Sequence, residues 1–497
     1  MKKSWISLYA MTQQLLFFPS RFMIASFRLS EPPLTHTHTC SSSPRFRQKL
    51  PLCLPQFPNP KTSNFPIMSS TNNHHPDDVV NGDNNHRVLK KPKLSFITVA
   101  EIAGEFSHHD PSVARINNGS FGSVPRSVLD AQRRHQLHFL RQPDAFYFTH
   151  LHPSIALSRS LLLPLINASS VDSISLVDNA TTATAIVLQH VSRAFNEGRF
   201  GEGDAVVMLH YAYGAVKKSV QAYVTRAGGF VYEVELPFPV YREEEIVREF
   251  RKVMEKAKRE GRRVRVAVID HITSMPSVVI PVKELVRVCR EEGVDQVFVD
   301  AAHAIGCIKV DVEDIGADFY TSNLHKWLFA PPAVAFLYCR NAEKCDGDND
   351  VHHPVVSHEY GNGLPVESAW IGTRDYSSQM VVPEMLVKAW GTHLGCSPHM
   401  CSSMVMVGLP LSLGIGSEAD ALKLRCQLRD KFGVEVPIYY RPPKEGEVDP
   451  LTGYARISHQ VYNTVDDYYK FRDAINQLVQ DGVSCATLLA DLEAVRR

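Results

Sequence analysis

An apolar run that ends abruptly on a carboxylate is the feature that most constrains the fold of this 497-residue chain. Residues 296–299 read QVFV, and Asp300 follows them directly. A strand buried inside a parallel sheet has this pattern, and ligands bind at the carboxyl ends of such strands. A second short strand, expected over residues 317–321, leads into the polar cluster SNLHKW at 322–327. The two strands together predict a ligand site at one edge of a parallel sheet.

Two side chains at this edge, Asp300 and Lys326, are of the types that can act together on one cofactor. Pyridoxal phosphate requires a lysine that holds its aldehyde covalently and a carboxylate that keeps its ring nitrogen protonated. These two residues can supply both groups, and His303 can bond the phenolic oxygen of the ring. An aspartate that caps a helix and a solvated lysine would give the same spacing. The pair alone therefore leaves both interpretations open.

The chain before residue 375 alternates short apolar strands with helical segments. Repeated strand–helix–strand units predict an α/β fold with a doubly wound, mainly parallel sheet and right-handed crossovers. Gly119 and Gly122 would let the backbone approach a ligand, or form a plain tight turn. The expected elements are a strand and glycine-flanked turn over 116–122, strands over 173–177, 204–209 and 264–269, a helix over 183–190 and a helical face from 282 to 289.

Four further segments complete the expected domain organisation. A large ligand-binding domain is expected over 125–375, a small α+β domain over 376–480 and a tail over 481–497. Residues 96–124 are expected to pack with the small domain. The elements predicted for the small domain are strands over 404–409, 434–439 and 454–458 and helices over 418–432 and 464–479.

The first 67 residues differ in composition from the rest of the chain. Residues 1–66 contain eight lysines and arginines against a single acid, Glu31, together with many serines and prolines. This composition fits a transit peptide for a plastid or mitochondrion. The alternative is an upstream extension of the gene, with Met68 as the natural start and a cytoplasmic protein. Residues 68–95 are polar and are expected to form a disordered linker.

Overall composition limits the classes of partner. The formal net charge is zero, so no global field favours nucleic acid or an anionic membrane surface. No run of eighteen apolar residues predicts a membrane-spanning helix. The ten cysteines include no C-x-x-C pair, which argues against a zinc site or a disulfide framework.

Six short motifs, taken together, resemble the class V aminotransferase superfamily of fold type I pyridoxal-phosphate enzymes. That superfamily holds cysteine desulfurases, isopenicillin-N-epimerase-like proteins and the plant L-cysteine desulfhydrases. The likeness spans about residues 94–478, is strongest to the desulfhydrases, and implies a fold type I architecture with bound pyridoxal phosphate. The motifs are NNGSFG at 117–122, NATTA at 179–183, DAAH at 300–303, NLHKW at 323–327, GTRD at 372–375 and RIS at 456–458.

The resemblance implies roles for the residues around the cofactor. Lys326 would hold the cofactor and move the substrate α-proton, Asp300 would stabilise the protonated ring, and His303 would bond it. Tyr213 would stack on the ring, with Tyr211 as the competing choice. The implied phosphate ligands are Ala180, Thr181, Asn323, His325 and, toward the cofactor of a second subunit in a homodimer, Thr373.

Substrate recognition is implied for Arg456 and Asn118. The planar fork of an arginine suits an α-carboxylate, and the resemblance places Asn118 near the substrate. Structural alternatives stand beside these roles. Residues 179–183 can be a plain helix cap, residues 372–375 a turn with a local Arg–Asp ion pair, and Arg456 a surface residue.

The activity implied by the strongest likeness is a lyase that degrades L-cysteine to hydrogen sulfide, pyruvate and ammonia. A cysteine desulfurase would instead need a nucleophilic thiol, for which Cys396 and Cys401 are the candidates. An epimerase or aminotransferase would share every cofactor residue. Relatives carry a long helical segment after the GTRD motif, and several of its turns are missing here near residue 384. An inactive dimeric scaffold is therefore the non-enzyme alternative.

Overall fold

The computed structural model describes residues 98–340, 351–383, 404–443 and 451–488, all within one compact unit. The predictions for residues 1–67, for the linker, for the segment near 384 and for Cys396 and Cys401 concern residues outside these ranges. Within the described ranges, no helix is both long and apolar enough to cross a membrane.

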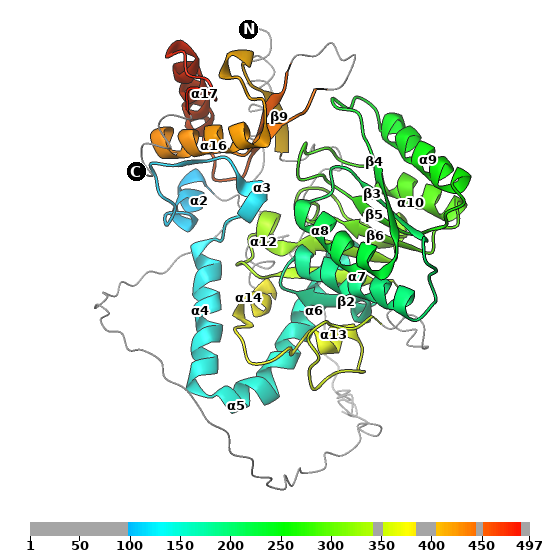
Figure 1. Ribbon diagram of the computed structural model, residues 1–497. Coiled ribbons are helices and arrows are strands. Elements are labelled where there is room, and N and C mark those ends of the chain that lie inside the picture. The colour runs from blue at the N-terminus through cyan, green and yellow to red at the C-terminus, as the bar shows by residue number, and fades with distance from the viewer. Residues whose placement is uncertain (1–97, 341–350, 384–403, 444–450, 489–497) are drawn as a thin grey trace, which may run out of the picture. The chain divides into compact units, whose positions relative to one another are not determined.

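A seven-stranded sheet forms the centre of the fold (Figure 1), in the order β2-β8-β7-β6-β5-β3-β4. Strands β3 to β7 pair in parallel, whereas β8 lies antiparallel between β7 and β2. The sheet is therefore mainly parallel, as predicted. The strands are β2 (Ile174–Val177), β3 (Ala205–Leu209), β4 (Phe230–Val234), β5 (Val264–Asp270), β6 (Gln296–Asp300), β7 (Phe319–Asn323) and β8 (Ala335–Cys339).

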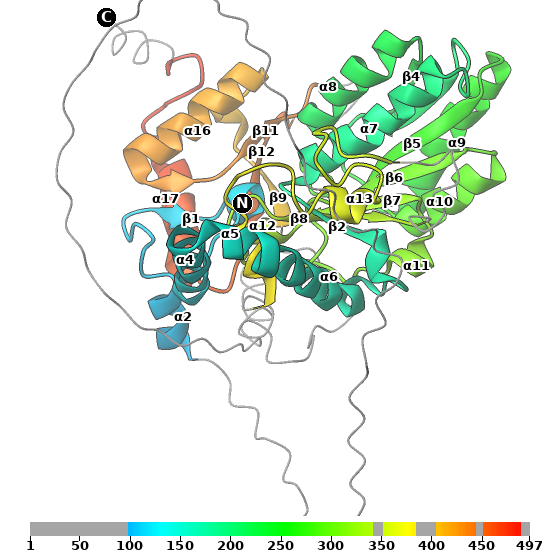
Figure 2. The same ribbon diagram turned by 90° about the horizontal axis from the view of Figure 1, so that it is seen from below.

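Helices cover both faces of this sheet because alternate strand residues point to opposite sides. Val206 and Met208 of β3 pack against α7 and α8, which lie side by side (Figure 1). Val207 and Leu209 belong to the core on the other face, with α4, α6, α9 and α10; α9 and α10 are neighbours (Figure 2). The helices are α4 (Arg126–Arg141), α6 (His152–Ile166), α7 (Ala180–Asn196), α8 (Gly214–Tyr223), α9 (Glu243–Arg259) and α10 (Val282–Glu291).

A second, smaller core is built from the C-terminal residues and the start of the described chain. Its sheet has the antiparallel order β11-β12-β9, and α16 and α17 pack on it. Strand β1 (Ala114–Arg115) pairs in parallel with β10 (Val434–Glu435), which joins the N-terminal segment to this core. The other elements are β9 (Met404–Gly408), β11 (Ile438–Tyr440), β12 (Gly453–Ser458), α16 (Glu418–Phe432) and α17 (Val465–Gln480).

Two expectations about local structure were wrong, and strands β4 and β8 were not predicted. The strand expected over 116–122 is shifted to β1, and Asn118–Phe121 forms one helical turn, α3. The strand expected over 434–439 is split into β10 and β11 around Pro437, whose nitrogen cannot donate to a ladder. Strand β8 was not anticipated, although it contributes a full antiparallel partner to β7.

The first residues assigned to the small domain pack instead with the large sheet. Tyr376, Met380 and Val382 belong to the same buried cluster as α6 and β3. The short helix α14 (Ser377–Met380) contacts both α4 and α6. Residues 376–382 therefore continue the large domain beyond the boundary expected at 375.

Candidate active site

Most of the predicted site residues, though not Asn118, Thr373 or Arg456, line a pocket of about 150 Å³ at the carboxyl ends of β5, β6 and β7. This is the edge at which parallel α/β sheets bind ligands. The residues that line it are Ser120, Asn179, Ala180, Thr181, Tyr213, Val216, Asp270, Ile272, Ser274, Asp300, Ala302, His303, Asn323, His325 and Lys326.

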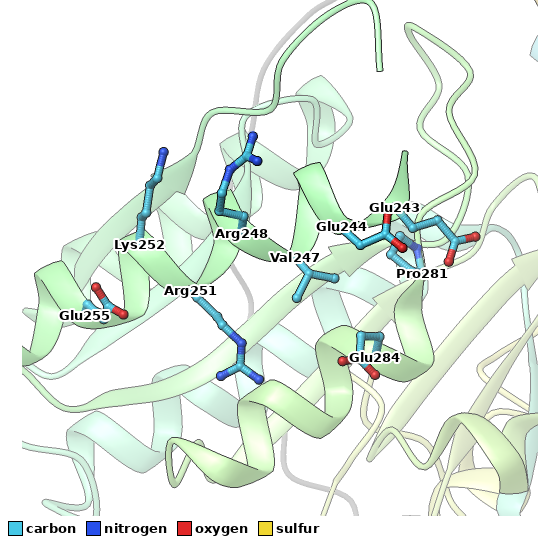
Figure 3. A pocket seen from close by; sticks show the side chains of 9 residues that line it. All are labelled: Glu243, Glu244, Val247, Arg248, Arg251, Lys252, Glu255, Pro281 and Glu284. Atoms are coloured by element: carbon cyan, nitrogen blue, oxygen red, sulfur yellow. The ribbon is translucent and has the colours of Figure 1, made fainter. Parts of the chain in front are cut away.

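A larger hollow of about 570 Å³ lies elsewhere, between α9 and α10 (Figure 3). Its lining is a mixture of acidic and basic side chains, including Glu244, Arg248 and Arg251. None of the predicted site residues borders it. The smaller pocket, and not the larger hollow, therefore gathers the groups with catalytic chemistry.

Lys326 reaches the pocket from α12 (Leu324–Trp327), the single helical turn that follows β7. Its Nζ lies 3.1 Å from His303 Nε2. Burial lowers the pKa of Lys326 to about 7; the negative charge of Asp300 opposes this shift, and the positive charge of Arg456 adds to it. A large fraction of the amine is therefore neutral and nucleophilic near neutral pH.

Asp300 is the last residue of β6 and is 5% exposed. Its Oδ1 accepts a hydrogen bond from the Ala302 amide at 3.1 Å. Burial raises the pKa of Asp300, while the Ala302 amide and the charge of Lys326 counteract the rise. The carboxyl group is held in place by the backbone and faces the lysine across the pocket.

His303 is buried, and burial is the main cause that keeps its pKa well below the usual value, with Lys326, Arg456 and His325 adding to it. The ring is therefore neutral. If Nε2 accepts from Lys326, the ring hydrogen is on Nδ1, which has no hydrogen-bond partner among the described residues. This leaves a buried donor free for a ligand oxygen.

The N-terminus of α7 forms one wall of the pocket. Asn179 caps this helix through a 2.9 Å bond from the Thr182 amide to its side chain. Asn323 Oδ1 accepts from the Ala180 amide at 2.9 Å, so the end of β7 is tied to the start of α7. Thr181 is exposed at the pocket. A helix N-terminus of this kind favours a phosphate group.

His325 was expected to bind the phosphate, but the hydrogen bond of its ring limits how it can do so. Its Nδ1 lies 3.1 Å from the Val334 carbonyl, to which only a protonated nitrogen can donate. Burial and then the charge of Lys326 lower the pKa of His325 to about 4. In the neutral ring Nε2 is then a hydrogen-bond acceptor. A hydrogen bond between Nε2 and a phosphate oxygen therefore requires a proton that the ligand supplies.

Of the two candidate aromatic residues, Tyr213 and not Tyr211 lines the pocket. Tyr213 precedes α8 and is 53% exposed. Tyr211 packs against the core on the other face of the sheet.

Arg456 lies in β12 and is 2% exposed, so it is not a surface residue. Its Nη1 donates to the Ser274 carbonyl at 2.8 Å, and its Nη2 donates to Asn117 Oδ1 at 3.1 Å and Ser120 Oγ at 2.9 Å. Arg456 Nε is buried without a partner among the described residues, and no carboxylate is paired with this guanidinium there. Burial lowers its pKa to about 10.

Asn118 is placed away from this group. Its Nδ2 donates to the Ser458 carbonyl and to Asn463 Oδ1, both at 3.0 Å, and it does not line the pocket. The preceding residue, Asn117, makes the contact with Arg456 instead. The shift of one position follows from the helical turn α3, which the sequence pattern did not predict.

Thr373 is exposed and does not line the pocket of its own chain. The neighbouring Arg374 forms an ion pair with Asp178, not with the adjacent Asp375 that the turn interpretation required. Asp375 instead accepts from the Ser377 amide and from Gln136. Within the described ranges, no cluster of three or more histidine, cysteine and acidic side chains is arranged to hold a metal ion.

Asp270, Ser120 and Ser274 line the pocket although no role was predicted for them, and the same holds for Asn117, which contacts Arg456 outside the pocket lining. Asp270 ends a buried strand just as Asp300 does, and this pattern is the signal that could have identified it. The serines carry no such signal, because they enter the pocket only through the paths of α3 and of the loop after β5.

Comparison with known proteins agrees with this geometry. Residues 148–348 match the family described as Aminotransferase class-V. A probable L-cysteine desulfhydrase, chloroplastic, from Arabidopsis thaliana is 62% identical over 431 residues, which cover 80% of this chain and 90% of the relative. The chain belongs to the class V aminotransferase family.

A second relative and a solved structure extend the comparison. An L-cysteine desulfhydrase of Arabidopsis thaliana is 56% identical, covering 82% of this chain and 98% of that protein. Among solved structures, a C-DES mutant with glycine covalently linked to its PLP cofactor has a TM-score of 0.52 and 18% identity. That alignment covers 75% of this chain and 96% of C-DES, and shows that the two share a fold.

Proposed function

We propose that the protein is a pyridoxal-phosphate-dependent lyase that degrades L-cysteine. In the balanced reaction, cysteine and one water give hydrogen sulfide, pyruvate and ammonia. The observation that carries the proposal is the convergence of Lys326 and Asp300 on one pocket, whose lining residues Ser120 and Ser274 bond Arg456, in a chain 62% identical to a probable L-cysteine desulfhydrase. The donor set supports the cofactor, and the relatives support the substrate.

The pocket residues fit pyridoxal phosphate. Lys326 offers an amine with a lowered pKa to the aldehyde, and Asp300 offers a buried carboxylate to the ring nitrogen. The unpartnered Nδ1 of His303 can donate to an oxygen of the ring. The start of α7 at Ala180 and Thr181 can hold the phosphate. When bound, the cofactor supplies an electron sink for the charge left on the substrate α-carbon.

The chain's own residues then perform binding and proton transfer. Arg456 binds the substrate carboxylate with its fork, and the contacts from Asn117 and Ser120 orient that fork. Lys326, once released from the cofactor, takes the proton from the substrate α-carbon. The lowered pKa of Lys326 suits this role, because a base is most effective when its pKa is near the working pH.

We also propose a homodimer with shared active sites. Large apolar side chains stand exposed on the described surface: Phe121 is 73%, Phe148 72% and Val356 71% exposed. A second copy of this chain would cover side chains of this kind at a symmetric interface. The exposure of Thr373 is consistent with its reaching the phosphate of the second subunit's cofactor.

The proposed location is a plastid. The basic, acid-poor composition of residues 1–66 supports a transit peptide, and the relative from Arabidopsis thaliana is named as chloroplastic.

A cysteine desulfurase is the second candidate, because it would use the same cofactor groups. A persulfide carrier must be accessible and readily ionised. Burial raises the pKa of Cys289 and Cys339 to about 12 each, and none of the described cysteines lines the pocket. The described thiols therefore favour elimination, and Cys396 and Cys401 remain the candidates for sulfur transfer.

The proposal is tested by sulfide release from L-cysteine by the purified full chain. We expect cysteine-dependent sulfide and pyruvate from the wild-type protein and neither from Lys326→Ala. A Lys217→Ala variant is the matched control, because Lys217 lies on α8 outside the pocket and pairs with Glu233. Absence of sulfide from a cofactor-loaded wild-type protein would refute the proposal.

A further inference from the structure

Two carboxyl groups, those of Asp270 and Asp300, lie side by side in the pocket. They are register partners at the last positions of the parallel strands β5 and β6. Strands in a sheet are about 4.8 Å apart, and paired residues point to the same face. The two residues are 3% and 5% exposed, and both line the pocket. Two carboxyls this close and this buried cannot both be ionised at neutral pH.

The hydrogen bonds of the two groups differ. Asp300 Oδ1 accepts from the Ala302 amide at 3.1 Å, and Asp300 faces the positive charge of Lys326. Asp270 Oδ2 is buried and has no partner among the described residues. A buried carboxylate oxygen without a donor is strongly unfavourable, whereas a protonated carboxyl carries no charge. The contacts therefore favour the ionised form at Asp300 and the protonated form at Asp270.

The charged groups around Asp270 do not reverse this preference. Lys217, a cation on α8 that acts on Asp270, is a third exposed and already pairs with Glu233 at 2.6 Å. His271 follows Asp270 and is neutral, since burial lowers its pKa to about 4. Burial and then the charge of Asp300 raise the pKa of Asp270 well above its usual value, although a backbone hydrogen bond from the amide of Asp270 and then the charge of Lys217 oppose them.

Tyr320 of β7 is the remaining titratable neighbour of the pair. Its hydroxyl lies 2.8 Å from His271 Nδ1, and burial and the charge of Asp300 raise its pKa well above the usual value. It is therefore neutral and adds no charge to the pocket.

We propose that Asp270 is a positioning residue that holds a proton beside Asp300 and so keeps the carboxyl pair at a single negative charge. This charge matches the single positive charge of a protonated ring nitrogen in the proposed cofactor. In this respect the inference rests on the proposed function. Asp270 acts through Asp300 and takes no part in bond breaking.

Infrared spectroscopy of the cofactor-loaded full chain at pH 7.5 tests the protonation state directly. A neutral carboxylic acid has a carbonyl stretch that ionised carboxylates lack. We expect this band in the wild-type protein, its loss in Asp270→Asn, and its retention in Asp430→Asn, a control at an exposed carboxyl on α16. An acid band that is absent from the wild type, or that persists in Asp270→Asn, would overturn the proposal.

The pH dependence of unfolding gives a second measurement, which needs no turnover. A carboxyl whose pKa is raised in the folded state binds more protons folded than unfolded, so stability falls as pH rises above about 4. We expect the unfolding constant of the wild type, divided by that of Asp270→Asn, to rise up to tenfold per pH unit from about pH 4 toward neutrality. A ratio independent of pH would contradict the proposal, even if the protein proved inactive on cysteine.

Discussion

Arg456 and Ser274, 182 positions apart in the sequence, are joined by a 2.8 Å hydrogen bond from the guanidinium Nη1 to the serine carbonyl. The bond brings β12 of the C-terminal core to the loop that follows β5. The guanidinium is buried without a paired carboxylate among the described residues, so its charge is available to an anionic ligand.

Replacing Arg456 by Lys should raise the KM for L-cysteine by about 10- to 100-fold, because a forked charge-assisted contact with the carboxylate is worth about 1.5–3 kcal/mol. Cofactor content should stay near that of the wild type. Steady-state kinetics of Arg456→Lys and of Arg425→Lys, a part-exposed arginine paired with Glu435, would make the comparison. An unchanged KM in Arg456→Lys would place the carboxylate site elsewhere.

The pKa of about 7 at Lys326 predicts the pH at which the apoprotein captures pyridoxal phosphate. Only the neutral amine attacks an aldehyde, so the capture rate should rise with pH through a midpoint near 7 and not near the usual lysine value. Asp300 raises this pKa, so Asp300→Asn should shift the midpoint downward. Stopped-flow absorbance after mixing apoprotein and cofactor measures the rate; a midpoint above about pH 9 would contradict the burial argument.

Gly122 has a φ of +68°, and a Cβ at this position would lie 1.7 Å from the His325 carbonyl oxygen and 3.0 Å from Lys326 Cα. Gly122→Ala should therefore destabilise the protein by roughly 2–4 kcal/mol, combining left-handed strain with overpacking. Gly198→Ala, at φ +75° with open space around it, should show only the smaller strain of about 1–2 kcal/mol. Denaturant unfolding of both variants measures the difference, and equal losses would show that the contact with the site is unimportant.

Subunit mixing tests whether Thr373 serves the active site of the other subunit. In a dimer of one Lys326→Ala chain and one Thr373→Ala chain, a single site keeps both Lys326 and Thr373 if the sites are shared. Co-expression at equal levels should therefore yield about a quarter of wild-type activity at limiting cofactor, since statistically half of the dimers are mixed. Activity no higher than the Thr373→Ala chain alone provides would mean that Thr373 acts within its own chain or not at all.

The sequence predicted the chemistry of the site better than its local geometry. Asp300 and Lys326 were predictable because each follows a short strand of a parallel sheet, and such strands end at the same edge. The resemblance placed Asn118 near the substrate, whereas Asn117 contacts Arg456, because the single helical turn α3 sets the direction of each side chain. The sequence left open whether Gly122 approaches a ligand or forms a tight turn, and its close contact with the backbone of His325 and Lys326 is a tertiary feature that neither interpretation included.

Two further features, strand β8 and the neutral state of His325, were not predicted because they depend on tertiary contacts. Strand β8 follows Lys326 so closely that the apolar pattern is continuous, and only the positive φ angles of Phe329 and Ala333 reveal the reversal of the chain. The neutral state of His325 depends on burial and on the charge of Lys326, which the Val334 carbonyl opposes, and no sequence motif records these contacts.

The products formed from L-cysteine in the absence of added reductant test the central claim most directly. A desulfhydrase should release sulfide and pyruvate in a one-to-one ratio, unchanged in Cys396→Ser and Cys401→Ser, because elimination needs no acceptor thiol. Alanine as the main product, lost in either cysteine variant, would contradict the account and identify sulfur transfer instead.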